Sequence, residues 1–194
     1  MPRRRLRTQG EIVERCRALA DDVRAALLRL PSEGSNPGVV DAVWRGESLG
    51  TLLWVLQLAE LPPYDRPFDP NEVVATSLEG ASLRDPPALK LERESARLWH
   101  WRARTTELQA SGNPELPGRY ATFDQLIAAT AMRGHDQGVL PPPLRGDFRA
   151  YGKIYRHLSP DQRAEAHSIA AERHHALNWV CGYGDSWDTV PLDT

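Results

Sequence analysis

The chain has 194 residues, a length that fits one domain with its own core. Hydrophobic residues make up 41% and charged residues 26%, values that exclude a wholly disordered chain. The formal net charge of −2 gives no broad basic surface, which argues against nucleic acid as a partner. No stretch approaches the eighteen or so uninterrupted apolar residues that a transmembrane helix needs, so we expect no membrane association.

The N-terminal sequence MPRRRLR has the basic start of a signal peptide, but TQGEIVERCRALADDVR follows with charges throughout. The apolar segment that a signal peptide requires is therefore missing. Cys16 and Cys181 lie far apart and form no CxxC motif, which favours two reduced thiols over a disulfide. We expect a cytoplasmic protein.

The first helix is expected to begin at a capping box, because Glu11 follows Thr8 by three residues. Apolar residues then recur at intervals of three and four, and Pro31 is expected to end the helix. This apolar stripe consists of Ile12, Cys16, Leu19, Val23, Leu27 and Leu30.

The second helix is expected between Val39 and Glu60. It is apolar on nearly every side, as is typical of an element inside a fold, so we take it as the central helix. Its large apolar residues are Trp44, Leu49, Leu52, Leu53, Trp54, Val55, Leu56 and Leu58.

Four further helices have an N-terminal signal, in which a capping residue precedes a proline or is followed by an acid or a glutamine. The signals and expected ends are Asp69–Pro70 to about Leu78, Asp85–Pro86 to Leu108, Thr122 with Gln125 to Gly134, and Ser159–Pro160 to about Cys181 with Gly182 as the stop.

The segment DFRAYGKIYRHL breaks the helical pattern, since Phe148, Ala150, Gly152 and Ile154 alternate with polar or aromatic residues. This period predicts an extended strap or a minor hairpin. The fold class is therefore all-α: a single-domain bundle of six or seven helices with irregular connections and a packed C-terminal strap. Residues 1–8 are expected to form a basic N-terminal arm, and residues 9–194 one helical domain.

Two charged residues fall on faces that are otherwise apolar. At 100° per residue Arg173 lies in the middle of the apolar stripe of the last helix, and Glu47 lies on that of the central helix. An unpaired buried charge costs several kcal/mol, so we expect the two residues to pair. The pair is either structural, fixing how two helices dock, or part of a polar site for an anionic or amide ligand.

Four histidines raise the question of a metal site. These are His100, His167, His174 and His175. The four-residue spacing of a zinc-binding helix is absent, as are paired cysteines, so we expect surface or capping histidines and no metal. The sequence also contains no P-loop and no GxSxG motif, and we expect no cofactor. The alternative is a metal site that joins His174 to Asp185, Asp188 or Asp193.

The basic N-terminal residues permit a weak nucleic-acid hypothesis. They are Arg3, Arg4, Arg5 and Arg7. Without a basic face to extend this footprint, a solvated arm is the expected structure.

The C-terminal sequence CGYGDSWDTVPLDT is unusually apolar for a chain end. We expect its large apolar residues to pack and its aspartates to reach arginines. These residues are Trp187, Val190 and Leu192, and Asp185, Asp188 and Asp193. The tail is either a structural strap, or it lines a ligand pocket or presents its end to a partner.

Four stretches resemble a bacterial family known only as domain of unknown function 4272. They are WRGESLGTLLWVLQLAELPPYDRPFD, LWHWRART, DFRAYGKIY and SIAAERHHALNWVCGYGDSWDTVPLDT, and the resemblance covers most of the chain from about Glu11. It implies no activity or substrate. It implies that recurring motif positions are Glu47, Trp54, Arg173, His174, Trp179, Trp187, Asp188, Asp193 and Thr194.

Two functional hypotheses follow. The first is a non-catalytic helical module that binds a protein or a small ligand. The second is a hydrolase that uses His174 with Asp188 or Glu47 near the last helix and the tail. The candidate binding residues are Glu47, Arg173, His174, Trp187, Asp188 and Asp193.

Overall fold

The computed structural model describes residues 5–33, 36–112, 116 and 118–193. Within these residues the chain forms six α-helices, one two-stranded hairpin and two short 3₁₀ turns. Their bounds are α1 (Gln9–Glu33), α2 (Pro37–Val55), α3 (Pro70–Ala75), α4 (Pro86–Ser111), α5 (Phe123–Asp136), β1 (Arg149–Ala150), β2 (Lys153–Ile154), η1 (Tyr155–His157), α6 (Pro160–Val180) and η2 (Trp187–Thr189). The all-α prediction is confirmed.

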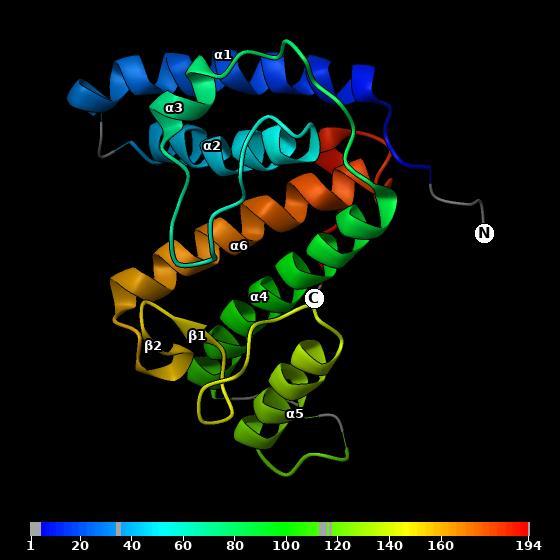
Figure 1. Ribbon diagram of the computed structural model, residues 1–194. Coiled ribbons are helices and arrows are strands. Elements are labelled where there is room, and N and C mark those ends of the chain that lie inside the picture. Colours follow the sequence, from blue (N-terminus) through cyan, green and yellow to red (C-terminus); the bar gives the residue numbers. More distant parts are fainter. Residues whose placement is uncertain (1–4, 34–35, 113–115, 117, 194) are drawn as a thin grey trace.

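The four long helices pack in the order α1, α2, α6, α4 (Figure 1). The short helix α3 covers α1 and α2, and α5 lies against α4 at the far end from α1. Because α2 has a neighbour on both sides, it buries residues around most of its circumference, including Leu49, Leu52 and Val55. The prediction of a central helix is confirmed. No helix in the described part of the chain is apolar over a length that would cross a bilayer.

The end of α2 was predicted wrongly, since the helix stops at Val55 and not at Glu60. Gln57 takes a left-handed conformation with φ of 59°. The backbone N–H of Gln57 donates to Trp54 (3.0 Å) and that of Leu58 to Leu53 (2.9 Å), which is the Schellman pattern that ends a helix. Glycine usually holds the left-handed position, so the sequence carried no stop signal there.

The capping predictions hold at four helix starts and fail at one. The side chains of Thr8, Thr122 and Ser159 each accept a hydrogen bond from the backbone N–H three residues later. Asp69 caps α3 through the N–H of Asn71. Asp85 precedes α4 but its side chain makes no capping bond.

Three other helix ends differ from the predictions by a few residues. The helix α1 continues through Pro31 and ends at Glu33. The helix α3 ends at Ala75 and not at Leu78, and α4 ends at Ser111 and not at Leu108. Helix assignments commonly shift by one or two residues because terminal turns fray.

The helix α5 passes through Gly134, which was expected to close it. A Cβ atom at this position would lie 2.6 Å from Cδ1 of Leu140 and 3.1 Å from Cδ1 of Leu98. The glycine therefore serves the close packing of the α5–β1 connection against α4, and not a helix stop.

The predicted minor hairpin is present. Strands β1 and β2 pair antiparallel with Arg149 opposite Ile154. The two turn residues, Tyr151 and Gly152, have φ of 52° and 70°, and positive φ at both positions matches the twist of a tight hairpin.

Residues 5–8 are not a solvated arm. The N–H of Arg7 donates to the carbonyl of Val180 (2.9 Å), and its guanidinium donates to the carbonyls of Gly184 (2.7 Å) and Asp185 (3.0 Å). Gly182 has φ of 76°, and a Cβ atom there would lie 2.4 Å from the carbonyl oxygen of Arg5. The segment before α1 is therefore fixed to the end of α6, whereas Arg3 and Arg4 lie outside the described residues.

The C-terminal segment is a packed strap, as predicted. Trp187 is buried, with its ring 5.4 Å from that of Trp179 and 4.5 Å from that of His175. Arg15 of α1 lies over the ring of Trp187 at 5.0 Å. The strap thus covers the last turns of α6 beside α1.

Two details of the strap prediction are wrong. Leu192 is 38% exposed and Val190 is the smaller residue that packs against the core. Asp185, Asp188 and Asp193 are exposed, and no ion pair of the described residues includes them. Arg7 binds the backbone carbonyl of Asp185 instead of its carboxylate.

Candidate functional site

Glu47 and Arg173 form the predicted ion pair between α2 and α6. The Nε atom of Arg173 lies 2.9 Å from Oε2 of Glu47, and the two side chains are 0% and 2% exposed. Burial raises the pKa of Glu47, while the charge of Arg173 acts in the opposite direction. With a partner in place, neither buried charge is left uncompensated.

The same pair also fixes the loop 61–68 that follows α2. Arg173 donates from Nη1 to the carbonyl of Pro62 (2.6 Å) and from Nη2 to that of Arg66 (3.0 Å). Glu47 accepts a hydrogen bond from the N–H of Phe68. The guanidinium therefore holds a helix and a loop at once, which is a structural role and not an open polar site.

A cleft of about 400 Å³ opens on the other side of this loop. We call it the Tyr64 cleft. Residues 60–65 form one wall, and α4 contributes Glu92, Ser95 and Trp99. Trp54 closes the α2 end, while Arg149 borders the cleft from the hairpin. The volume falls within the range of about 300–1,000 Å³ that is typical of small-molecule sites.

Tyr64 connects the ion pair to the cleft. Its ring lies between the guanidinium of Arg173 at 4.9 Å and the ring of Trp99, which stacks on it at 5.2 Å with an interplanar angle of 10°. Its hydroxyl donates to Oε1 of Glu92 (2.8 Å). Burial raises the pKa of Tyr64 well above its ordinary value, so the phenol stays a donor.

Glu92 is the half-buried acid of the cleft. Burial raises its pKa, and the hydrogen bond from Tyr64 and the charge of Arg173 only partly oppose this. Oε2 of Glu92 has no hydrogen bond within the described chain, and it is not sealed from solvent. Asp65 lies in the opposite wall, and its Oδ2 accepts a hydrogen bond from the N–H of Tyr151.

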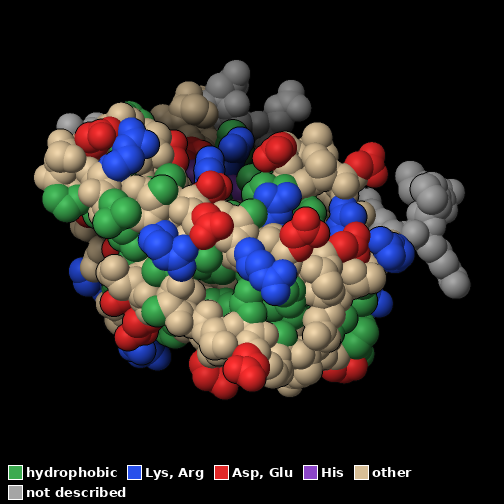
Figure 2. Space-filling view, turned by 90° about the horizontal axis from the view of Figure 1, so that it is seen from above, with side chains coloured by type: hydrophobic (Ala, Val, Ile, Leu, Met, Phe, Trp, Pro, Cys, Tyr) green, Lys and Arg blue, Asp and Glu red, His purple; other side chains and the backbone are tan. Residues whose placement is uncertain are grey.

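A second hollow lies between α1, α2 and α3, with a volume of about 420 Å³. Its apolar lining comes from Cys16, Ala20, Leu49, Leu53, Val73 and Leu78. Figure 2, which views the molecule from the α1 side, shows such an apolar hollow among mixed acidic and basic side chains. At its edge Arg24 pairs with Asp21 (2.9 Å) and donates to the carbonyl of Val74, so these charges are already partnered.

The histidines at positions 100 and 174 are buried, which contradicts the prediction of surface or capping side chains. Their Nδ1 atoms lie 3.1 Å apart, between α4 and α6. Nε2 of His174 lies 3.0 Å from Nδ2 of Asn178. Both ring nitrogens of His174 are thus occupied, and neither is available to Asp188.

The hydrogen-bond partners of Asn178 determine which nitrogens of His174 and His100 carry protons. Its Oδ1 accepts from Nε of Arg93 (2.7 Å), a pure donor, and its Nδ2 donates to the carbonyl of Pro191 (2.8 Å), a pure acceptor. Nδ2 is therefore also the donor to Nε2 of His174. It follows that neutral His174 carries its proton on Nδ1 and donates to His100, which carries its proton on Nε2.

The other predicted positions do not converge on one site. His175 faces the strap, with Nε2 lying 3.0 Å from the carbonyl of Trp187. His167 stacks on the ring of His100 at 5.5 Å and pairs with Glu107 at 3.0 Å. Asp188 and Asp193 are exposed, and Thr194 lies outside the described residues. Among the described residues, no group of three or more His, Cys, Asp or Glu side chains is placed to hold a metal ion.

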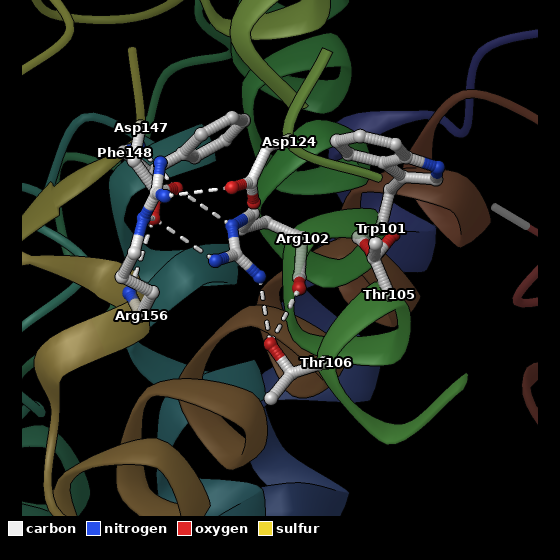
Figure 3. Close-up of polar contacts among 8 residues, drawn as sticks. All are labelled: Trp101, Arg102, Thr105, Thr106, Asp124, Asp147, Phe148 and Arg156. Carbon is white, nitrogen blue, oxygen red and sulfur yellow. Dashed lines mark hydrogen bonds and ion pairs between the residues drawn. The ribbon is translucent and has the colours of Figure 1, made fainter. Parts of the chain in front are cut away.

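Sequence reasoning missed a second buried ion pair. Arg102 of α4 donates from Nε and Nη2 to the two oxygens of Asp147 (2.7 and 3.0 Å), and both side chains are buried. Figure 3 shows Arg156 converging on the same carboxylate, with Asp124 of α5 beside it. Burial raises the pKa of Asp147, but the hydrogen bonds and charge of Arg102, together with the N–H groups of Arg156 and Phe148, outweigh this, so the pKa is lowered.

The sequence did contain a signal for this second pair. Arg102 follows Trp99 by three residues and precedes Thr105 by three, so it lies on the buried stripe of α4 just as Arg173 lies on that of α6. The network fastens the hairpin and α5 to α4, which makes it structural.

No protein-family model, no curated protein and no solved structure matches this chain.

Proposed function

We propose that the protein is a non-catalytic helical module that binds a small ligand in the Tyr64 cleft. The observation that carries the proposal is the fixed position of the cleft wall. Loop 61–68 has no regular secondary structure, yet Arg173 and Glu47 bind its backbone at four residues, which are Pro62, Pro63, Arg66 and Phe68. A cleft that is already formed loses little conformational entropy when a ligand enters.

The composition of the cleft also favours ligand binding. Trp54 and Trp99 supply apolar surface, and Glu92 and Asp65 supply a few polar groups. This combination of aromatic walls with a small number of polar groups is typical of small-molecule sites. The apolar hollow beside α1 supports a protein partner less well, because two of its three charged lining residues, Asp21 and Arg24, are paired with each other.

The alternative hydrolase loses support from the positions of its proposed groups. Glu47 is committed to Arg173, and His174 to His100 and Asn178. None of these residues lines the Tyr64 cleft. Cytoplasmic location and membership of the bacterial family named above are kept as parts of the proposal.

The tryptophans allow a direct test by NMR. The six indole N–H signals can be assigned by single Trp-to-Phe variants and followed during a fragment screen. We expect hits that shift the signals of Trp54 and Trp99, whereas those of Trp179 and Trp187, where the strap packs on α6, stay in place. Hits should be recovered chemically unchanged. A screen whose hits spare both cleft tryptophans would refute the proposal, and turnover of a hit would favour the hydrolase.

A further inference from the structure

We infer that the Tyr64 cleft selects organic cations, with the ammonium group of the ligand bound by the carboxylate of Glu92. This inference rests on the proposed function and names its ligand class. It starts from the charges that line the cleft. Three carboxylates, those of Glu60, Asp65 and Glu92, face one guanidinium, that of Arg149.

The position of Glu92 decides which sign of charge prevails. Glu92 is half-buried, whereas Arg149 is exposed and surrounded by water. Charges in contact with water are screened, and charges in a desolvated cleft act much more strongly on a ligand. The potential inside the cleft is therefore set by the acid.

Glu92 also lacks a cationic partner. Its only hydrogen bond in the described chain comes from the neutral phenol of Tyr64, and the nearby guanidinium of Arg173 is bound to Glu47 and to carbonyls of the loop. The raised pKa of Glu92 has the same origin, since burial has removed part of its hydration and no cation pairs with it. A bound ammonium group would supply the missing partner at the free oxygen.

The aromatic walls suit the rest of such a ligand. The ring of Trp54 lies next to the acidic loop, with Arg84 over it at 4.4 Å. Trp99 lies beyond Ser95 on the same helix as Glu92. An aryl or alkyl group can therefore contact apolar surface while its amine reaches Glu92. Asp65 offers a second oxygen from the facing wall.

The test compares three probes of one shape and different charge: 2-phenylethylamine, 2-phenylethanol and phenylacetate. Dissociation constants are measured by NMR titration at pH 7.5 in about 0.15 M salt. Hydrogen bonds to charged groups predict that the amine binds about 10- to 100-fold more tightly than the alcohol, with phenylacetate weakest.

Glu92→Gln keeps an acceptor for Tyr64 but removes the charge. We expect this variant to bind the amine no better than the alcohol, and continued binding of the alcohol reports an intact cleft. Glu94→Gln is the matched control, because Glu94 lies on the same helix, pairs with Arg97 and does not line the cleft. It should leave all three affinities unchanged.

Each other result overturns the inference. Equal affinities for the three probes at the indole signals of Trp54 and Trp99 would leave the binding module in place but remove its cation selectivity. Preference for phenylacetate would assign the anchor to Arg149. Amine selectivity that survives in Glu92→Gln would exclude Glu92. Failure of the amine to bind would reject the cation class, while the fragment screen decides separately whether the cleft binds any ligand.

Discussion

His174 donates a hydrogen bond to His100 across the buried contact between α4 and α6, with 3.1 Å between the two Nδ1 atoms. The arrangement works only while both rings are neutral. A proton added to His100 would place two N–H groups face to face, and one added to His174 would oppose the amide of Asn178. Burial accordingly lowers the pKa of His100 to about 4 and that of His174 to about 3.

We expect acid to destabilise the protein before most carboxylates titrate. Between about pH 6.5 and pH 5 the unfolded state binds protons at these two histidines and the folded state does not, so stability falls as pH falls. The two groups together lower the free energy of unfolding by up to about 2.7 kcal/mol per pH unit. Urea unfolding at several pH values measures this slope.

Two controls isolate the contribution of the pair. His157→Gln removes an exposed histidine and should leave the slope unchanged. The ring C–H signals of His100 and His174 should stay constant in NMR spectra from pH 7.5 to pH 5.5. Titration of either ring near pH 6.5 would contradict a buried pair of neutral rings.

Loss of one partner of the Glu47–Arg173 pair should be severe. Arg173→Met leaves the carboxylate of Glu47 buried without a cationic partner and removes the donor of the loop carbonyls, so we expect a loss of about 3–5 kcal/mol in the free energy of unfolding. Arg29→Met removes an arginine from an exposed pair of 2.6 Å with Glu33 and should change nothing measurable. Equal effects in the two variants would contradict the structural role of the buried pair.

The strap should stabilise the fold mainly through Trp187. Trp187→Ala is expected to cost about 3 kcal/mol, which lowers the melting temperature by about 6–12 °C in a chain of this length. Deletion of residues 183–194 should lower it at least as much. Leu192→Ala serves as the control, because Leu192 is exposed and should not matter. A truncated protein that melts at the wild-type temperature would exclude the strap.

Gly134 should tolerate no side chain. Gly134→Ala places a Cβ atom 2.6 Å from Leu140 and is expected to destabilise the protein by about 1–3 kcal/mol, despite the better helix propensity of alanine. Gly10→Ala is the matched variant, since it lies in α1 with no atom within 4 Å of the new Cβ. It should stabilise the protein by up to about 1 kcal/mol. A stabilised Gly134→Ala would refute the packing argument.

Capping residues and helical periodicity are local properties, and they predicted the helices well. The signals at Thr8, Thr122 and Ser159 lie within one turn of the bonds they make, so no distant contact is needed to read them. Helix ends were harder. Gln57 adopts a left-handed conformation that is not expected for a glutamine. Gly134 lies inside a helix because the side chain of Leu140, six residues away, leaves no room for a Cβ atom.

The sequence by itself determined that Arg173 and Glu47 must meet, because each is a charge on an apolar stripe and a buried charge needs a partner. It also determined that the tail packs, because burial of the Trp187 side chain stabilises the fold by more than the conformational entropy lost when the chain end becomes ordered. Only the tertiary structure decided that the pair fixes a loop, that this loop forms a cleft with Glu92, and that two neutral histidines form a hydrogen bond inside the core. These relationships join residues that are distant along the chain, and a one-dimensional pattern records which face a residue occupies but not which residue it meets there.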